Sequence, residues 1–240
     1  MIKSLLKSLI PEKSKKLLRE KLGVPSQESS FKNIRDLGFS PEYCLDIGAY
    51  EGLWTKEFKQ IFPGCAVMMV EGQNLKGPAL IKTQKAYKDV DYRIALLGAA
   101  EETVTFNIYD TASSVLVEHH DTNAQTETRK LIRLDNLLKE TNFKRPDFIK
   151  IDTQGYELEI LKGGEKTLAH AEFVLLEVSF LDIYLDCPLV TDTLNFMKER
   201  GFVVYDICTL MRRPLDKALF QSDFLFVKEG SQFRNNKKWS

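Results

Sequence analysis

Short apolar segments alternate with helix-like segments along most of the chain. The expected strands are Tyr43–Ile47, Ala66–Glu71, Asp91–Leu97, Val104–Tyr109, Phe148–Asp152, Phe173–Val178, Phe202–Ile207 and Asp223–Lys228, and residues 130–134 are expected to pair with one of them. Helices are expected near 51–62, 76–87, 156–161 and 189–200. Strands that alternate with helices are typical of a parallel sheet with helices on its faces. The pattern therefore predicts an α/β, doubly wound domain.

The two ends of the chain differ from this alternating body. Residues 1–22 are basic, and their apolar residues fall on one helical face, which predicts an amphipathic helix. Such a helix packs on its own domain or docks on a membrane surface or a partner. We assign residues 1–30 to this helix and a linker (23–30), residues 31–230 to the main domain, and residues 231–240 to a polar tail. No apolar run reaches the roughly 18 residues that a transmembrane helix requires, and the N-terminus does not resemble a signal peptide.

The distribution of charge along the chain limits the kinds of molecule that the protein can bind. The 240 residues carry a formal net charge of zero, but residues 1–22 hold +5 and the last ten hold +3, so residues 23–230 carry −8. An acidic body repels a phosphate backbone, which argues against binding to nucleic acid. The four cysteines show no CxxC spacing and no clustering with histidine, which predicts reduced thiols, no zinc site and a cytoplasmic location.

The turn after the first expected strand carries the first chemical signal. It runs from Asp46 to Gly52, with glycines at 48 and 52 and Ala49 between them. A dinucleotide-binding turn reads GxGxxG and offers bare amides to a pyrophosphate, whereas this turn contains carboxylates. The second strand ends at Glu71, where a carboxylate can accept hydrogen bonds from both hydroxyls of a ribose. This combination predicts a phosphate-free, positively charged nucleoside such as S-adenosylmethionine. The alternative is that the glycines serve packing and that Glu71 is a solvated acid.

Three further acids lie within or just after later strands. Asp152 ends the central strand, beside the first strand, and is placed to touch the methionine end of such a cofactor or the acceptor. Glu157 is either part of the site or a first-turn acid favoured by the helix dipole. Glu177 lies inside an apolar strand, where a carboxylate is costly unless it is paired. It is either functional or in a salt bridge, with Lys150 as the candidate partner.

The chain resembles a known protein family in four places. These are CLDIGAYEGLWT, the VEG that ends the second strand, ASSVL at 112–116, and FIKIDTQGYELEILKGG followed by LLEVSF. The family that they resemble is that of the FkbM-type methyltransferases. The likeness runs from about Tyr43 to Lys228. It implies a class I methyltransferase (Rossmann-like) fold with a seven-stranded, mostly parallel sheet and an antiparallel last strand. It also implies S-adenosylmethionine as methyl donor and O-methylation of a hydroxyl on a sugar, glycan or secondary metabolite. One departure concerns the adenine: relatives often carry a polar residue after the third strand, where this chain has Gly98 and Ala99.

The resemblance places the cofactor on the turn that holds Asp46, Gly48, Ala49 and Gly52, on Glu71 and on Asp152. A hydroxyl acceptor requires a base or a metal. The candidate bases are Asp152, His119 and His120, and we expect no required metal. Acceptor specificity is expected in two irregular segments, 110–130 and 179–188. Two other functions stay open: a non-catalytic relative that binds a glycan or partner, and an NAD(P)-dependent oxidoreductase.

Overall fold

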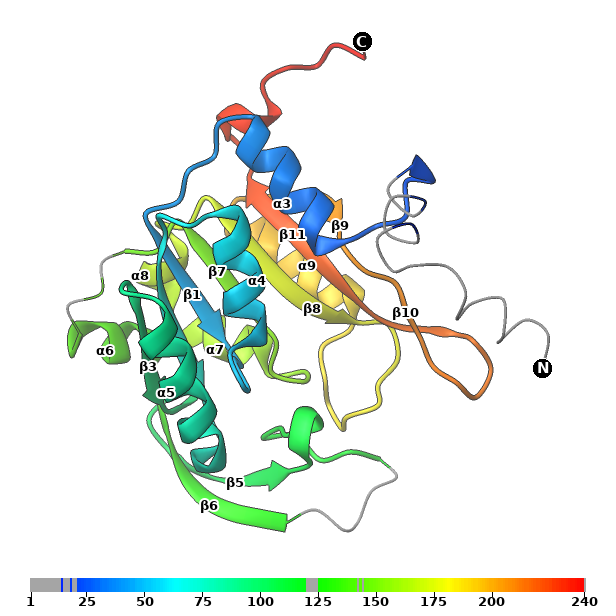
Figure 1. The fold of residues 1–240 in the computed structure, drawn as a ribbon. Helices are drawn as coiled ribbons and strands as arrows, with labels where there is room; N and C mark the ends of the chain where they lie inside the picture. The colour runs from blue at the N-terminus through cyan, green and yellow to red at the C-terminus, as the bar shows by residue number, and fades with distance from the viewer. Residues whose placement is uncertain are drawn as a thin grey trace.

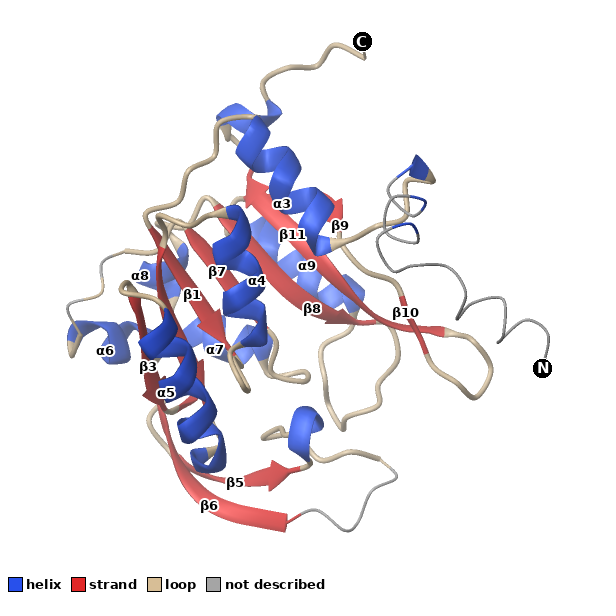
Figure 2. Ribbon diagram, in the orientation of Figure 1, coloured by secondary structure: helices blue, strands red, loops and turns tan. Residues whose placement is uncertain are grey.

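The computed structural model describes residues 14, 18, 21–119, 125–141, 143 and 145–239. Within these residues the chain forms a mostly parallel central sheet with helices on both faces (Figures 1 and 2). The strands are β1 (Tyr43–Ile47), β2 (Ala66–Glu71), β3 (Val90–Ile94), β4 (Leu96–Leu97), β5 (Thr103–Ile108), β6 (Gln125–Ile132), β7 (Phe148–Ile151), β8 (Phe173–Ser179), β9 (Phe202–Ile207), β10 (Met211–Arg212) and β11 (Leu219–Lys228). The α-helices are α3 (Gln27–Asp36), α4 (Leu53–Ile61), α5 (Gly77–Ala86), α6 (Leu134–Lys139), α7 (Glu157–Gly163), α8 (Glu165–Leu168) and α9 (Val190–Glu199), and the short 3₁₀ turns are η1 (Asn74–Lys76), η2 (Asp110–Ala112) and η3 (Gln232–Arg234).

The strands of the central sheet follow one path in which the order reverses once. The path runs β3-β2-β1-β7-β8-β11, β9 pairs with the far side of β11, and β11 is antiparallel to both of its long neighbours. The other strands of this path are parallel, and the order reverses between β1 and β7. The predicted fold and its antiparallel last strand are confirmed. The predicted count of seven is one short in the described part of the chain, because β10 also pairs with β11.

Strand alternation divides the core into two layers. Cys44, Met69 and Phe148 face α3, α4 and α5, whereas Leu45 and Ile149 face α6 to α9. Side chains on a strand point alternately to opposite faces, so one apolar strand supplies both layers. Helices on both faces are therefore needed to bury the central strands. A ligand can then bind only at an edge of the sheet, and in open α/β sheets this is the edge at the carboxyl ends of the strands.

The expected third strand is divided in two. Its second part, β4, leaves the central sheet and pairs with β6, while β6 pairs with β5 in the opposite direction. The sequence prediction of one strand over 91–97 is corrected here. Figure 1 shows β5 and β6 standing apart from the central sheet, and together with β4 they form a small sheet of their own.

The linker expected over 23–30 is shorter than predicted. Helix α3 begins at Gln27, after Ser26, whose hydroxyl accepts the Ser29 N–H at 3.1 Å as an N-cap. Gln27 donates to Asp223 at 2.7 Å and accepts from the Trp54 indole at 2.7 Å. The main domain therefore begins before residue 31, since this helix is bonded to both α4 and β11.

The tail and the N-terminal segment complete the comparison with the expected domains. Phe233 packs on Phe39 and Phe173, so the first residues of the expected tail belong to the domain. The amphipathic helix predicted for residues 1–22 lies almost wholly outside the described residues. Among the residues described, no helix is both long enough and apolar enough to cross a bilayer.

Candidate active site

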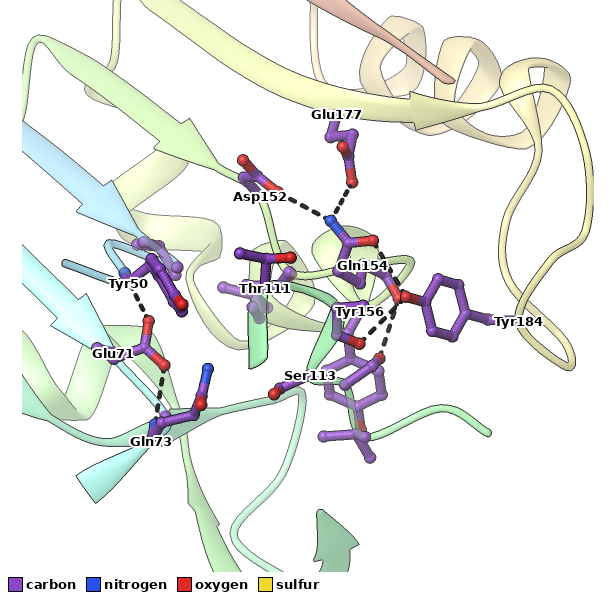
Figure 3. Close-up of a pocket in the computed structure, with 18 of the residues that line it drawn as sticks. Tyr50, Glu71, Gln73, Thr111, Ser113, Asp152, Gln154, Tyr156, Glu177 and Tyr184 are labelled. Carbon is purple, nitrogen blue, oxygen red and sulfur yellow. Dashed lines mark hydrogen bonds between the residues drawn. The ribbon is translucent and has the colours of Figure 1, made fainter. Parts of the chain in front are cut away.

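A cavity of about 610 Å³ lies at the carboxyl ends of β2, β1, β7 and β8. Its wall includes Glu71, Gly48, Asp152 and Glu177, which come from these four strand ends in that order. Figure 3 shows the polar side chains of this wall. The reversal of strand order between β1 and β7 opens a crevice there, because the connections on either side run in opposite directions.

The turn after β1 is packed tightly against the turn after β7. Gly48 has a φ of +74°, and a Cβ at this position would lie 1.9 Å from the Asp152 carbonyl oxygen. Only glycine combines this conformation with so close an approach. Gly52, with a φ of +73°, instead faces Thr83 and Met69 and begins α4. The first glycine therefore shapes the cavity, and the second serves the packing of α4 on α5 and β2.

A buried lysine lies under the same turn. Lys150 Nζ donates to the Gly48 carbonyl at 2.9 Å and lies 3.6 Å from Asp152 Oδ2. It also lies 3.2 Å from Asp46 Oδ1, as an ion pair without hydrogen-bond geometry. The other Asp46 oxygen accepts from the Thr55 hydroxyl at 2.6 Å. The neighbouring carboxylates raise the pKa of Lys150 although its burial opposes this, so the lysine stays charged.

Glu71 is held from both sides by the main chain. The Tyr50 N–H donates to Oε2 at 2.7 Å and the Gln73 N–H donates to Oε1 at 2.8 Å (Figure 3). Burial raises the pKa of this carboxyl, and the two amides work against that shift. Each oxygen keeps a further lone pair for a ligand. The carboxylate is therefore fixed in place before any ligand arrives.

Next to Glu71 the cavity becomes apolar. Its wall there is formed by Val70, Leu96, Leu97 and Phe106. Gly72 leaves room for this wall, because a Cβ on it would meet Leu96 at 2.9 Å. A flat, uncharged ring system suits such a surface, because burying apolar area against it is favourable.

At the other end of the cavity, Gln154 joins two carboxylates. Its Nε2 donates to Glu177 Oε2 at 2.9 Å and to Asp152 Oδ1 at 3.3 Å, while its Oε1 accepts from the Tyr184 hydroxyl at 3.1 Å (Figure 3). Gln221 adds a second amide donor to Glu177 Oε2 at 3.0 Å. Gln154 has a φ of 56°, a rare backbone conformation for a residue with a side chain. Of the two alternatives for Glu177, the salt bridge to Lys150 is not formed among the described residues, and the carboxylate is held by amides instead.

Glu157 organises the turn after β7. Its Oε1 accepts the N–H groups of Thr153 at 2.8 Å and of Gly155 at 3.2 Å. Burial raises the pKa of Glu157 to about 7, and the amides oppose that shift. This acid therefore does more than interact with the helix dipole: it fixes the loop that carries Gln154.

Two segments expected to determine specificity pair with each other across the cavity. In the cap (residues 110–119), Glu118 forms a β-bridge with Tyr184, and the His119 N–H donates to the Ile183 carbonyl at 3.0 Å. The Ser114 hydroxyl donates to the Gln154 carbonyl at 3.0 Å. The cap therefore lies over the cavity and is tied to Gln154, whose side chain bonds to both carboxylates.

The comparisons with known proteins decide the family. The sequence model of the methyltransferase FkbM domain matches residues 46–204, more than half of the chain. The chain belongs to the FkbM methyltransferase family. S-adenosylmethionine is therefore the methyl donor of this FkbM protein, and the carboxylate-lined wall of the cavity suits that cationic molecule.

The individual proteins that resemble this FkbM chain match it over only part of its length or at low sequence identity. Hexuronic acid methyltransferase AglP of Haloferax volcanii is 33% identical over 84 residues, which are 32% of this chain and 35% of that protein. Precorrin-6y C5,15-methyltransferase from Geobacter metallireducens aligns with a TM-score of 0.49 and 14% identity over 83% of this chain and 86% of its own. Magnesium protoporphyrin IX methyltransferase from Synechocystis PCC 6803 aligns with a TM-score of 0.49 and 11% identity over 84% and 79%.

The structure brings some predicted site residues of the FkbM domain together and leaves others apart. Gly48, Glu71 and Asp152 line the cavity. The remaining predicted cofactor residues, Asp46, Ala49 and Gly52, are buried behind the described lining. The Asp46 carboxylate is turned toward Thr55 on α4 and toward Lys150, so it stands beside the turn rather than on the described wall.

Of the two predicted histidines, the one that the structure describes, His119, does not line the cavity. His119 is exposed on the cap and is not among the lining residues, and His120 lies outside the described residues. Sequence reasoning missed Gln154 and Gln221, whose amides carry no signal until the fold places them beside an acid. Across the described residues, no three His, Cys, Asp or Glu side chains are close enough to hold a metal ion.

Proposed function

We propose that this FkbM protein transfers the methyl group of S-adenosylmethionine to a hydroxyl of a sugar, glycan or secondary-metabolite acceptor. The observation that carries this proposal is the continuity of the cavity. It joins the fixed carboxylate of Glu71 to the pair formed by Asp152 and Glu177 at the other end. Donor and acceptor can thus lie end to end in one continuous cavity, and holding them in line supplies much of the rate of methyl transfer.

The donor has one orientation that satisfies both ends of the cavity. Its ribose hydroxyls donate to the free lone pairs of Glu71, and its adenine lies against Leu96 and Phe106. Its amino-acid end lies over Gly48, beside Asp152. Gly98 packs closely against Gly163 and is not among the described lining residues of the cavity. The acceptor then occupies the space between Glu177 and the cap.

The charge of the wall favours an uncharged acceptor. Of the described residues that line the cavity, Glu71, Glu118, Asp152 and Glu177 are acidic and none is Lys, Arg or His. An anionic acceptor would bring like charges together, and the described wall offers it no cationic side chain as a partner, which is costly in a partly closed site. AglP, named as a hexuronic acid methyltransferase, supports a sugar acceptor, but the wall here favours a neutral sugar over a uronic acid.

The test combines binding with transfer. Isothermal titration with S-adenosylmethionine, S-adenosylhomocysteine and NADH is expected to show micromolar binding of the first two and none of the third. Methyl transfer is then measured by mass spectrometry on matched pairs of neutral sugars and their uronic acids, and we expect product from the neutral member. NADH binding alone, or a cofactor that binds while only uronic acids are methylated, would contradict the proposal.

A further inference from the structure

Glu177 has one oxygen held and one oxygen open. Both amide donors, from Gln154 and Gln221, bond to Oε2. Oε1 accepts no hydrogen bond from the described residues. It is also not buried, so it faces the open space of the cavity that Glu177 lines. A carboxylate fixed through one oxygen and free at the other is suited to take a proton from a bound hydroxyl.

The groups around Glu177 oppose its negative charge. Asp152 directly follows the neighbouring strand β7, Asp223 lies opposite Glu177 on β11, and Glu157 lies on α7. The nearby cation, Lys150, is already paired with Asp46 and Asp152. Burial, followed by these acids, raises the pKa of Glu177 well above its usual range. The described acids around Glu177 therefore oppose its ionisation before a donor binds.

We propose that Glu177 is the base of the reaction and that it loses its own proton only when a positively charged donor enters the cavity. This inference rests on the proposed function, because it requires the donor to lie along the wall from Glu71 to Asp152. A cation beside Asp152 favours the ionised form of its neighbour Glu177. The base is thus charged when the donor is present and neutral when it is absent.

The proton and charge balance of the step is complete. When bound, S-adenosylmethionine supplies a methyl group whose bond to sulfur breaks as its bond to the acceptor oxygen forms. Glu177 Oε1 takes the proton that the acceptor hydroxyl loses. One positive sulfonium and one negative carboxylate become a neutral thioether and a neutral carboxylic acid. Glu177 passes its proton to solvent when the next donor binds.

Asp152 and His119 are less suited to this task. Asp152 lies 3.6 Å from the Lys150 ammonium, so its charge is already compensated and it is better placed to bind the donor. His119 is exposed on the cap, outside the described wall. Glu177 combines a place on the wall, a fixed oxygen and an open oxygen.

The experiment needs no acceptor. Titration calorimetry at pH 7 in two buffers of different ionisation enthalpy counts the protons released on binding. S-adenosylmethionine and S-adenosylhomocysteine share their ribose and amino-acid ends, so contributions from Glu71 and Asp152 cancel in the comparison. We expect the sulfonium compound to release roughly half a proton or more beyond the neutral thioether.

Variants assign the proton to one residue. Glu177→Gln should abolish the difference in proton release while it still binds S-adenosylhomocysteine, because glutamine keeps an oxygen for the amides but does not ionise. Glu199→Gln, an exposed site on α9, is the matched control and should retain the difference. If Glu177→Gln fails to fold, the ¹³C carboxyl signal of Glu177 in the unaltered protein replaces it and should shift toward the ionised form with the sulfonium ligand alone.

The outcomes separate this inference from the proposed function. Equal proton release with both ligands, or a difference that survives in Glu177→Gln, overturns the role of Glu177 and leaves the methyl donor site standing. Failure of both ligands to bind overturns the proposed function, and this inference with it.

Discussion

Lys150 and Asp46 form a buried ion pair under the turn that shapes the cavity. The ammonium lies 3.2 Å from Asp46 Oδ1, and both side chains are withdrawn from solvent. The same ammonium donates to the Gly48 carbonyl, so the pair connects the end of β1 to the end of β7. Asp46 thus acts on the site through Lys150 and the turn, without lining the cavity.

Loss of one member of this pair should destabilise the protein and the site together. Removing one partner leaves an uncompensated buried charge, which typically costs about 3–5 kcal/mol. Asp46→Ala is expected to lower the free energy of unfolding by about this amount and to weaken S-adenosylmethionine binding at least tenfold, about 1.4 kcal/mol. Urea denaturation and calorimetry measure the two effects. The double variant Asp46→Ala, Lys150→Met should regain part of the stability; no regain would contradict a charge effect.

Gly48 should tolerate no side chain. Gly48→Ala places a Cβ 1.9 Å from the Asp152 carbonyl at a φ of +74°, so the turn has to move. We expect a loss of about 2 kcal/mol or more in unfolding free energy, since strain at such positions costs of order 1–3 kcal/mol before the clash is counted. Gly64→Ala is the matched control, because nothing lies within 4 Å of its added Cβ. Similar denaturation midpoints for the two variants would contradict the packing argument.

Glu71→Gln should weaken binding of donor and product alike. Glutamine replaces one carboxylate oxygen by an amide group that cannot accept a ribose hydrogen bond and that faces a backbone N–H. A lost hydrogen bond to a charged group is worth about 1.5–3 kcal/mol, so affinity should fall roughly ten- to hundredfold. Calorimetry with both nucleosides measures this, with the exposed Glu57→Gln as control. Unchanged affinity would remove Glu71 from the ribose site.

Because of Glu157, the folded protein should be more stable at mildly acidic pH than at neutral or alkaline pH. Its pKa in the folded protein is about 7, above its ordinary value of 4.5, so between these pH values the folded state holds a proton that the unfolded chain has released. The free energy of unfolding therefore decreases as the pH rises through this window, by up to about 3 kcal/mol. Denaturation at pH 5 and pH 8 measures the slope. Glu157→Gln should flatten it, and an unchanged slope would assign the effect to other acids.

Much of the fold follows from local patterns. The expected ranges of β1, β2 and β9 agree with the structure residue for residue, because a short apolar run bounded by turn residues has few other solutions. Helix α3 was missed because its polar sequence, QESSFKNIRD, contains few apolar residues. The division between β3 and β4 was missed because pairing with β6 is a long-range choice.

The candidate site likewise combines residues that local sequence patterns place and contacts that only the tertiary structure forms. The sequence by itself placed Gly48, Glu71 and Asp152 at one edge, because the ends of neighbouring parallel strands meet there. Only the tertiary structure turned Asp46 away from the cavity and brought Gln154 and Gln221 to Glu177, residues that are 23 and 44 positions from it. Sequence periodicity sets which strand end a residue occupies, but the direction and ionisation of a side chain depend on neighbours that only the packed sheet and its cap bring within reach.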